Sequence, residues 1–274
     1  MRHQNYHDHT SQGGQKWDTF QILFSNGFLE KDDKLWEDAL RIENWVKEMD
    51  QGANARIRPN VATYEAIIQA WIKTGTEVGL EKAESWAQRL LDVASPLGPI
   101  KPRLQTFHPI LAAHAFTGQL TQLEVWIGRL TGANASCQPD CRVRGLEITA
   151  HVNAMKQKIR KIDSSGVTDS ELTHHAEACS RLLRDFTTEV FTFYKGESRN
   201  SLFLKVEAFL ETAQAWECLA HHRSAAGGDV DYCVQRALEV QELHSSITRR
   251  LEVIDVNYVL SAHVRQQVDH LRFN

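Results

Sequence analysis

Apolar residues in the first half of the chain recur at helical spacing. One set follows the order i, i+3, i+4, i+7 and i+8: Tyr64, Ile67, Ile68, Trp71 and Ile72. A second set begins one helix later: Leu80, Ala83, Trp86, Ala87, Leu90 and Leu91. This spacing places apolar side chains on one face of an α-helix. The pattern therefore predicts pairs of amphipathic helices that bury their apolar faces against each other and against neighbouring pairs.

Two landmarks indicate that the helix pair is a repeat. A threonine followed by an aromatic residue occurs, at spacings of 44 and 43 residues, at Thr19, Thr63 and Thr106. A tryptophan two residues after a glutamate occurs, at spacings of 41 and 40 residues, at Trp45, Trp86 and Trp126. A fixed period of about this length is typical of helical-repeat proteins, in which each unit packs against its neighbours. The landmark aromatic residues are therefore expected in the core.

Start and stop signals agree with this period. A proline precedes each new unit: Pro59, Pro102 and Pro139. Proline cannot continue a helix and commonly follows its end. Gly75 and Gly118 stand between the two helices of a unit, where a helix end often needs the positive φ of glycine. Asn60 and Asp33 are expected to cap the helices that follow, because their side chains can accept hydrogen bonds from first-turn amides.

The predicted fold is all-α, a right-handed α-solenoid of about five stacked antiparallel helix pairs. The helical-repeat domain is assigned to residues 16–252. Its repeats are clear over 17–140 and degenerate over 141–252, where the landmarks are lost. In the degenerate part, one helix pair is expected around a polar insertion at 163–166, and another around a turn at 225–229.

The termini and the composition narrow the class of protein. Residues 1–15 are expected to be a disordered polar N-terminus, with neither the apolar core of a secretory signal nor the pattern of a transit peptide. Residues 253–274 are expected to form a C-terminal capping helix. No run of about 18 apolar residues occurs, so no membrane span is expected. Five cysteines, an odd number, favour a reducing compartment over a disulfide framework.

Residues 59–75 and 79–86 carry the clearest copy of the repeat. They are Pro-Asn-Val-Ala-Thr-Tyr-Glu-Ala-Ile-Ile-Gln-Ala-Trp-Ile-Lys-Thr-Gly and Gly-Leu-Glu-Lys-Ala-Glu-Ser-Trp. These segments resemble the first and second helices of a pentatricopeptide repeat, and weaker copies begin at Gln105 and Asp18. The Pro-Asn-Val-Ala-Thr-Tyr start favours this family over the tetratricopeptide repeats, which are also helix pairs.

The resemblance implies that the chain binds single-stranded RNA, in RNA processing, stability or translation within mitochondria or chloroplasts. In this family, side chains on the concave surface contact one splayed-out base per repeat. Carried over residue by residue, the base-reading candidates are the pairs Gln21 with Asn60, Glu65 with Arg103, and His108 with Asp140. Of these, Asn60 and Asp140 have residue types that are usual in the family.

Cations at the unit junctions could contact the phosphates of such an RNA. The candidates are Arg56, Arg58, Lys101, Arg142 and Arg144, together with Arg103. Lys156, Lys158, Arg160 and Lys161 would extend this ladder. Solvated surface charges are an equally open interpretation. The net charge of -4 and the negative Glu65 favour an alternative, a protein-interaction scaffold of the tetratricopeptide-like type whose groove holds a peptide or helix.

Catalysis is not expected, because no Gly-rich phosphate loop, nucleophile elbow or His-Glu-x-x-His sequence occurs. We therefore expect no enzyme, cofactor or small-molecule substrate. Cys137 and Cys141, even with His151, lack the second cysteine pair of a typical structural zinc site, so no metal is expected. The doublets at 174–175 and 221–222 are interpreted as surface or groove histidines. Because a repeat begins shortly after Met1, the chain could also be a fragment of a longer array.

Overall fold

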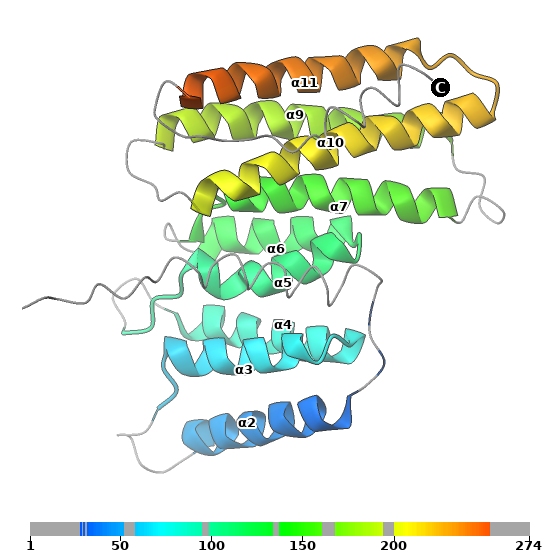
Figure 1. Cartoon of the computed structure of the whole chain (residues 1–274). Coiled ribbons are helices and arrows are strands. Elements are labelled where there is room, and N and C mark those ends of the chain that lie inside the picture. The colour runs from blue at the N-terminus through cyan, green and yellow to red at the C-terminus, as the bar shows by residue number, and fades with distance from the viewer. Residues whose placement is uncertain are drawn as a thin grey trace, which may run out of the picture. The chain divides into compact units, whose positions relative to one another are not determined.

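The computed structural model describes residues 28, 30, 32–51, 58–94, 99–133, 137–160, 168–193 and 200–252. All regular structure within these ranges is helical, which confirms the all-α prediction (Figure 1). The chain divides into two compact units, unit 1 (Met1–Thr117 and Glu124–Pro139) and unit 2 (Gly118–Leu123 and Asp140–Asn274). The predicted disordered terminus at 1–15 and capping helix at 253–274 lie outside the described residues, as do the site candidates Gln21 and Arg56.

Unit 1 is built from successive helices that pack on one another. They are α2 (Asp33–Gln51), α3 (Val61–Lys73), α4 (Glu77–Val93), α5 (Leu104–Phe116) and most of α6 (Leu120–Ala133). Helix α3 contacts α2, α4 and α5, and α4 also contacts α5. Figure 1 shows α3 and α4 side by side as an antiparallel pair joined by a short turn. This is the predicted helix pair of the clear repeats.

The geometry where α3 ends and α4 begins explains why glycine stands at two positions there. Gly75 has a φ of 65°, as the sequence predicted, and Thr76 caps α4 by accepting a 3.0 Å bond from the amide of Gly79. A Cβ atom at position 79 would lie 2.7 Å from the carbonyl oxygen of Trp71 and 2.0 Å from Oγ1 of Thr74. Glycine at position 79 therefore allows the first turn of α4 to approach the end of α3.

Helix starts confirm one predicted cap and correct the other. Asn60 caps α3, since its Oδ1 accepts from the amide of Thr63 at 3.0 Å. The predicted cap at Asp33 is wrong by one residue, because Asp33 is already the first residue of α2. Oδ1 of Asp32 accepts from the amides of Lys34 and Leu35 at 2.9 and 3.1 Å.

Two of the three landmark tryptophans are in the core of unit 1. Trp126 and Trp86 are 1% and 6% exposed, whereas Trp45 is 55% exposed, so the prediction of a buried Trp45 is wrong. The buried residues of α2 show why: Ala39, Glu43 and Val46 lie 44 residues before Ala83, Ala87 and Leu90, which are buried in α4. This register aligns Trp45 with the exposed Arg89, and the spacing of 41 residues was out of phase.

Unit 2 contains the two predicted degenerate helix pairs. The first consists of α7 (Cys141–Arg160) and α9 (Asp169–Phe193), and the second of α10 (Asn200–Ala225) and α11 (Asp231–Glu252). Helix α10 packs against α7, α9 and α11 around a core that includes the fully buried Trp216. The glycine turn between α10 and α11 has Gly227 at a φ of 69°.

Two arginines tie the last pair to α9. Arg223 of α10 forms a bidentate ion pair with Asp169, at 2.8 and 2.9 Å. Arg236 of α11 contacts Glu177 at 2.8 Å and lies over the ring of Trp216. Paired guanidinium and carboxylate groups with fixed geometry add specificity to an apolar interface.

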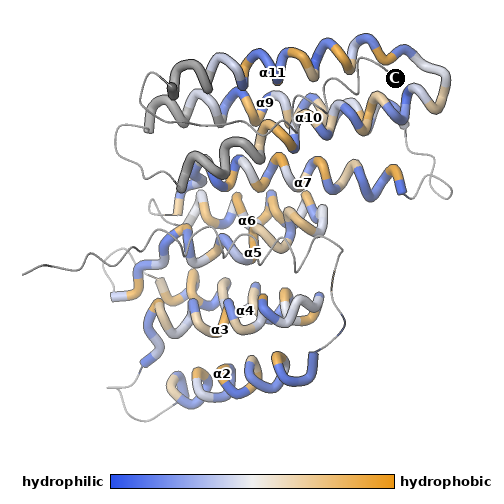
Figure 2. Tube along the Cα trace, viewed as in Figure 1, coloured by the Kyte–Doolittle hydropathy of each residue, from blue (hydrophilic) through white to orange (hydrophobic). Residues whose placement is uncertain are grey.

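Apolar and hydrophilic residues alternate along the helices (Figure 2). This distribution fits amphipathic helices that bury one face. None of the helices described here has a stretch long and apolar enough to cross a membrane.

Candidate functional site

The amino-terminal halves of α3 and α5 are neighbours at one edge of unit 1. Oγ1 of Thr106, in the first turn of α5, donates a 2.7 Å hydrogen bond to Oε1 of Glu65 in α3. Three cations precede or begin these two helices and are exposed to solvent: Arg58, Lys101 and Arg103. We call this surface the α3/α5 edge. The amino-terminal end of a helix carries partial positive charge, so two such ends beside three cations favour an anionic ligand.

The start of α3 uses its polar side chains internally. Oδ1 of Asn60 accepts from both the amide and the hydroxyl of Thr63, at 3.0 and 3.1 Å. The amide of Asn60 in turn donates to Oγ1 of Thr63 at 3.3 Å, which completes a capping box. Asn60, a base-reading candidate, is therefore also the N-cap of α3.

The start of α5 has the same sequence spacing and a different bonding pattern. Arg103 takes the N-cap position, and its side chain makes no capping bond. The hydroxyl of Thr106 is therefore not bound to a cap residue and bonds instead to Glu65, which is half-buried. Glu65 and Arg103 were predicted to read one base together. Glu65 bonds to the first turn of α5, and Arg103 is the N-cap residue of that helix.

The remaining base-reading candidates lie in different surroundings. His108, on α5 in unit 1, is 7% exposed. Asp140, in unit 2, caps α7, with its Oδ1 accepting from the amides of Arg142 and Val143 at 2.9 and 3.2 Å.

The candidate cations of unit 2 are more often half-buried or bonded to other side chains than those of the α3/α5 edge. Arg142 is half-buried, and Arg144 is paired with Glu147 at 3.2 Å. Lys156 bonds to Gln214 at 2.9 Å, and Lys158 pairs with Glu171 at 3.2 Å. Arg160 is exposed, and Lys161 lies outside the described residues.

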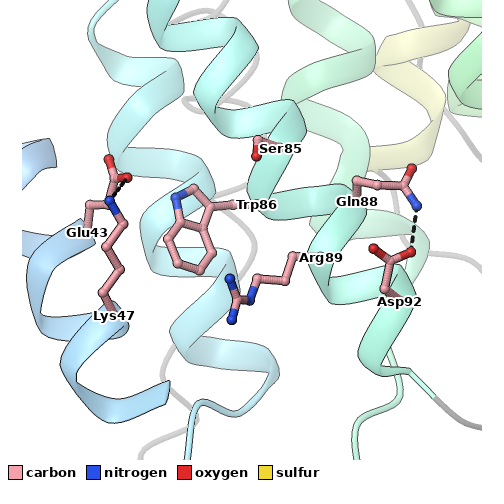
Figure 3. A pocket seen from close by; sticks show the side chains of 7 residues that line it. All are labelled: Glu43, Lys47, Ser85, Trp86, Gln88, Arg89 and Asp92. Carbon is pink, nitrogen blue, oxygen red and sulfur yellow. Dashed lines mark hydrogen bonds and ion pairs between the residues drawn. The ribbon is translucent and has the colours of Figure 1, made fainter. Parts of the chain in front are cut away.

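A groove between α2 and α4, also in unit 1, was not predicted from the sequence. Its volume is about 580 Å³, and its lining residues are Glu43, Lys47, Ser85, Trp86, Gln88, Arg89 and Asp92 (Figure 3). The lining charges are internally paired: Lys47 contacts Glu43 at 2.7 Å, and Gln88 donates to Asp92 at 2.9 Å. Arg89 pairs with Asp50 and lies over the ring of Trp86.

This groove is close to neutral, because two acidic and two basic side chains line it. The two helices beside it are joined by residues about one repeat apart in sequence, such as Lys82 with Glu43 at 3.3 Å. One feature of the sequence could have indicated this groove. Glu43, Lys47 and Asp50 are spaced so that all three lie on one face of α2.

No family model, curated protein or solved structure matches this chain.

Buried polar groups in unit 1 meet at a carboxylate. Oε1 of Glu84 lies 2.8 Å from Nε2 of His114 and accepts a bond from the indole nitrogen of Trp126. Burial raises the pKa of Glu84, but the bonds from His114 and Trp126 outweigh it and hold the pKa below its ordinary value. This ionised carboxylate therefore joins α4, α5 and α6.

Unit 2 contains a buried histidine pair. Nδ1 of His151 on α7 lies 2.9 Å from Nδ1 of His175 on α9, and each residue is 8% exposed. Burial, with a smaller contribution from nearby positive charge, lowers the pKa of each imidazole to about 4. The sequence interpretation of His175 as a surface or groove residue is therefore wrong, because its partner lies on another helix.

Neither this pair nor any other group in the described part of the chain brings together three or more His, Cys, Asp or Glu side chains able to hold a metal ion. Cys137, one of the two cysteines considered for zinc, instead has its Sγ 3.5 Å from the carbonyl oxygen of Pro102.

Proposed function

We propose that this chain is a helical-repeat protein of the pentatricopeptide type that binds single-stranded RNA in organellar RNA processing, stability or translation. The observation that carries the proposal is the α3/α5 edge, where exposed Arg58, Lys101 and Arg103 stand at two adjacent helix starts. Its setting would be a right-handed solenoid of about five helix pairs, with the phosphates following the unit junctions.

The charge balance of the chain is consistent with a local contact surface. A net charge of -4 gives no general attraction to polyanions, so affinity has to come from a local cluster. Cations without strong internal partners can replace the counterions of a phosphate backbone, and this release drives binding. Among the predicted phosphate contacts, the α3/α5 edge provides exposed cations, whereas Arg144 is already paired with Glu147.

The test is fluorescence anisotropy with mixed-sequence single-stranded RNA over a salt series. The variant Arg58→Ala/Lys101→Ala/Arg103→Ala should bind more weakly, and its plot of log K against log salt should be shallower by about 2, since each lost single-strand phosphate contact removes about 0.7. The matched control is Lys34→Ala/Lys73→Ala/Arg184→Ala, which removes three exposed cations located elsewhere. Equal losses in both variants would mean that the α3/α5 edge is not the RNA site.

The neutral groove between α2 and α4 favours a second function, a protein-interaction scaffold. Mixed and internally paired charges beside an aromatic residue suit a peptide better than a polyanion. If the wild-type protein binds no RNA even at low salt, the RNA proposal fails. Binding of a peptide or helix that is weakened by Trp86→Ala or Arg89→Ala would then support the scaffold.

A further inference from the structure

We infer that the α3/α5 edge binds RNA without reading its bases, so that binding depends on the phosphate backbone alone. This inference rests on the proposed function and specifies its substrate class. Its basis is that three of the predicted base-reading side chains, Asn60, Glu65 and Asp140, are bonded within the protein, and a fourth, His108, is buried.

Asn60 shows the conflict most directly. An asparagine that reads a base edge presents a donor and an acceptor together. Oδ1 of Asn60 is held by the amide and the hydroxyl of Thr63, and the backbone of Asn60 donates back to the same threonine. Turning the side chain toward a base would break a capping box at the first turn of α3. The helix start and the base therefore compete for one oxygen atom.

Of the two described positions on the first helices, one is bonded within the protein and the other is buried. Oε1 of Glu65 accepts from Thr106 of the next first helix, which fixes the carboxylate between α3 and α5. His108 is 7% exposed, so too little of its ring is accessible to contact a base edge. Glu65 therefore joins the first helices of consecutive repeats.

Two of the base-reading candidates that follow a proline are Asp140 and Arg103, and the Arg103 side chain makes no capping bond. Asp140 holds the first turn of α7 through two amides. Arg103 makes no capping bond and is exposed, but its partner at the reading site, Glu65, is already bonded to Thr106. A lone exposed arginine can contact any phosphate, and guanine is the base that it would select if it read one.

The experiment compares the affinity of the full chain for unstructured RNA oligomers of equal length that are rich in U, in C or in A, or are U-rich with interspersed G. We expect dissociation constants within about threefold of each other at one salt concentration, because a bidentate base contact separates bases by roughly tenfold or more. The variant Arg58→Ala/Lys101→Ala/Arg103→Ala should weaken all four interactions by the same factor.

Two further variants locate any preference. Asn60→Ser keeps a capping oxygen, and Glu65→Gln keeps an acceptor for Thr106. Both variants should leave the ratios of the dissociation constants for the four oligomers unchanged. A tenfold preference for one oligomer overturns the inference and leaves the proposed function standing. If no oligomer binds at low salt, the proposed function fails and the inference fails with it.

Discussion

The two units satisfy their buried polar groups in different ways. In unit 1, His114 and Trp126 both bond to the carboxylate of Glu84, which joins three helices. In unit 2, His151 and His175 bond to each other across α7 and α9, and no carboxylate stands between them. Both arrangements lie within stacked helix pairs. Apolar spacing therefore predicts the helix pairs, while the buried polar contacts differ from pair to pair.

This difference sets how each unit responds to acid. Hydrogen bonds from His114 and Trp126 keep the pKa of Glu84 below its ordinary value despite burial, so the carboxylate stays ionised in mild acid. The imidazoles of His151 and His175 have pKa values of about 4, so the folded protein holds both in the neutral form. Mild acid should therefore destabilise unit 2 first.

The largest effect is expected from replacing buried tryptophans. It tests whether a tryptophan must carry the Glu-x-Trp landmark to lie in the core. Trp126 carries the landmark and Trp216 does not, yet they are 1% and 0% exposed. Trp126→Ala and Trp216→Ala should each lower the free energy of unfolding by about 3–5 kcal/mol, through lost burial and a cavity. Urea denaturation followed by circular dichroism measures both losses.

Trp45→Ala is the control for this pair. Trp45 carries the landmark but is 55% exposed, and substitutions at exposed positions usually change stability by less than about 0.5 kcal/mol. A loss at Trp45 as large as that at Trp126 would contradict the register described for α2.

The second prediction is acid sensitivity of the α7/α9 interface. Folding lowers the pKa of each imidazole from 6.5 to about 4, so the stability it contributes is present above pH 6.5 and is lost as the pH falls from 6.5 toward 4. Between pH 7.5 and pH 5 the free energy of unfolding should fall by about 2 kcal/mol for each imidazole. Denaturation midpoints across this range measure the loss, and hydrogen exchange of α7 and α9 locates it.

Variants separate this pair from other titrating groups. His151→Leu/His175→Leu should reduce the pH dependence, because neither of these two imidazoles is then present to gain a proton on unfolding. His221→Gln, which removes an exposed histidine of α10, should leave the dependence unchanged. A wild-type protein equally stable at pH 7.5 and pH 5 would show that the imidazoles are not held neutral in the folded state.

Local features of the fold could be predicted from the sequence. Apolar spacing predicted the helix pairs of both units, and glycine chemistry predicted the positive φ angles of Gly75 and Gly118. Asn60 was predicted as a cap because an asparagine before a helix can accept from its first turn. These features depend on residues within one or two helical turns of each other, where sequence distance and spatial distance agree.

Side-chain contacts between helices could not be predicted in the same way. The bond between Thr106 and Glu65 spans 41 residues, and the pair of His151 and His175 spans 24. Each depends on how neighbouring helices are rotated about their axes, which apolar periodicity defines only approximately. The error at Trp45 has the same origin, because a shift of three residues between two landmarks moves a side chain from the core to the surface.

The smallest expected effect concerns the starts of α3 and α5. Arg103 and Thr106 have the same spacing as Asn60 and Thr63, but the arginine makes no capping bond. Arg103→Asn should therefore stabilise the protein by up to about 1 kcal/mol by giving α5 a capping acceptor. The gain should be at the low end of that range, because the hydroxyl of Thr106 already bonds to Glu65. The same change should weaken the RNA binding that we propose for the α3/α5 edge, since it removes a cation there. Arg103→Ala, which removes the charge without adding a cap, should weaken binding equally without the gain in stability. Equal unfolding free energies for the two variants would mean that a capping side chain at the start of α5 contributes nothing to stability.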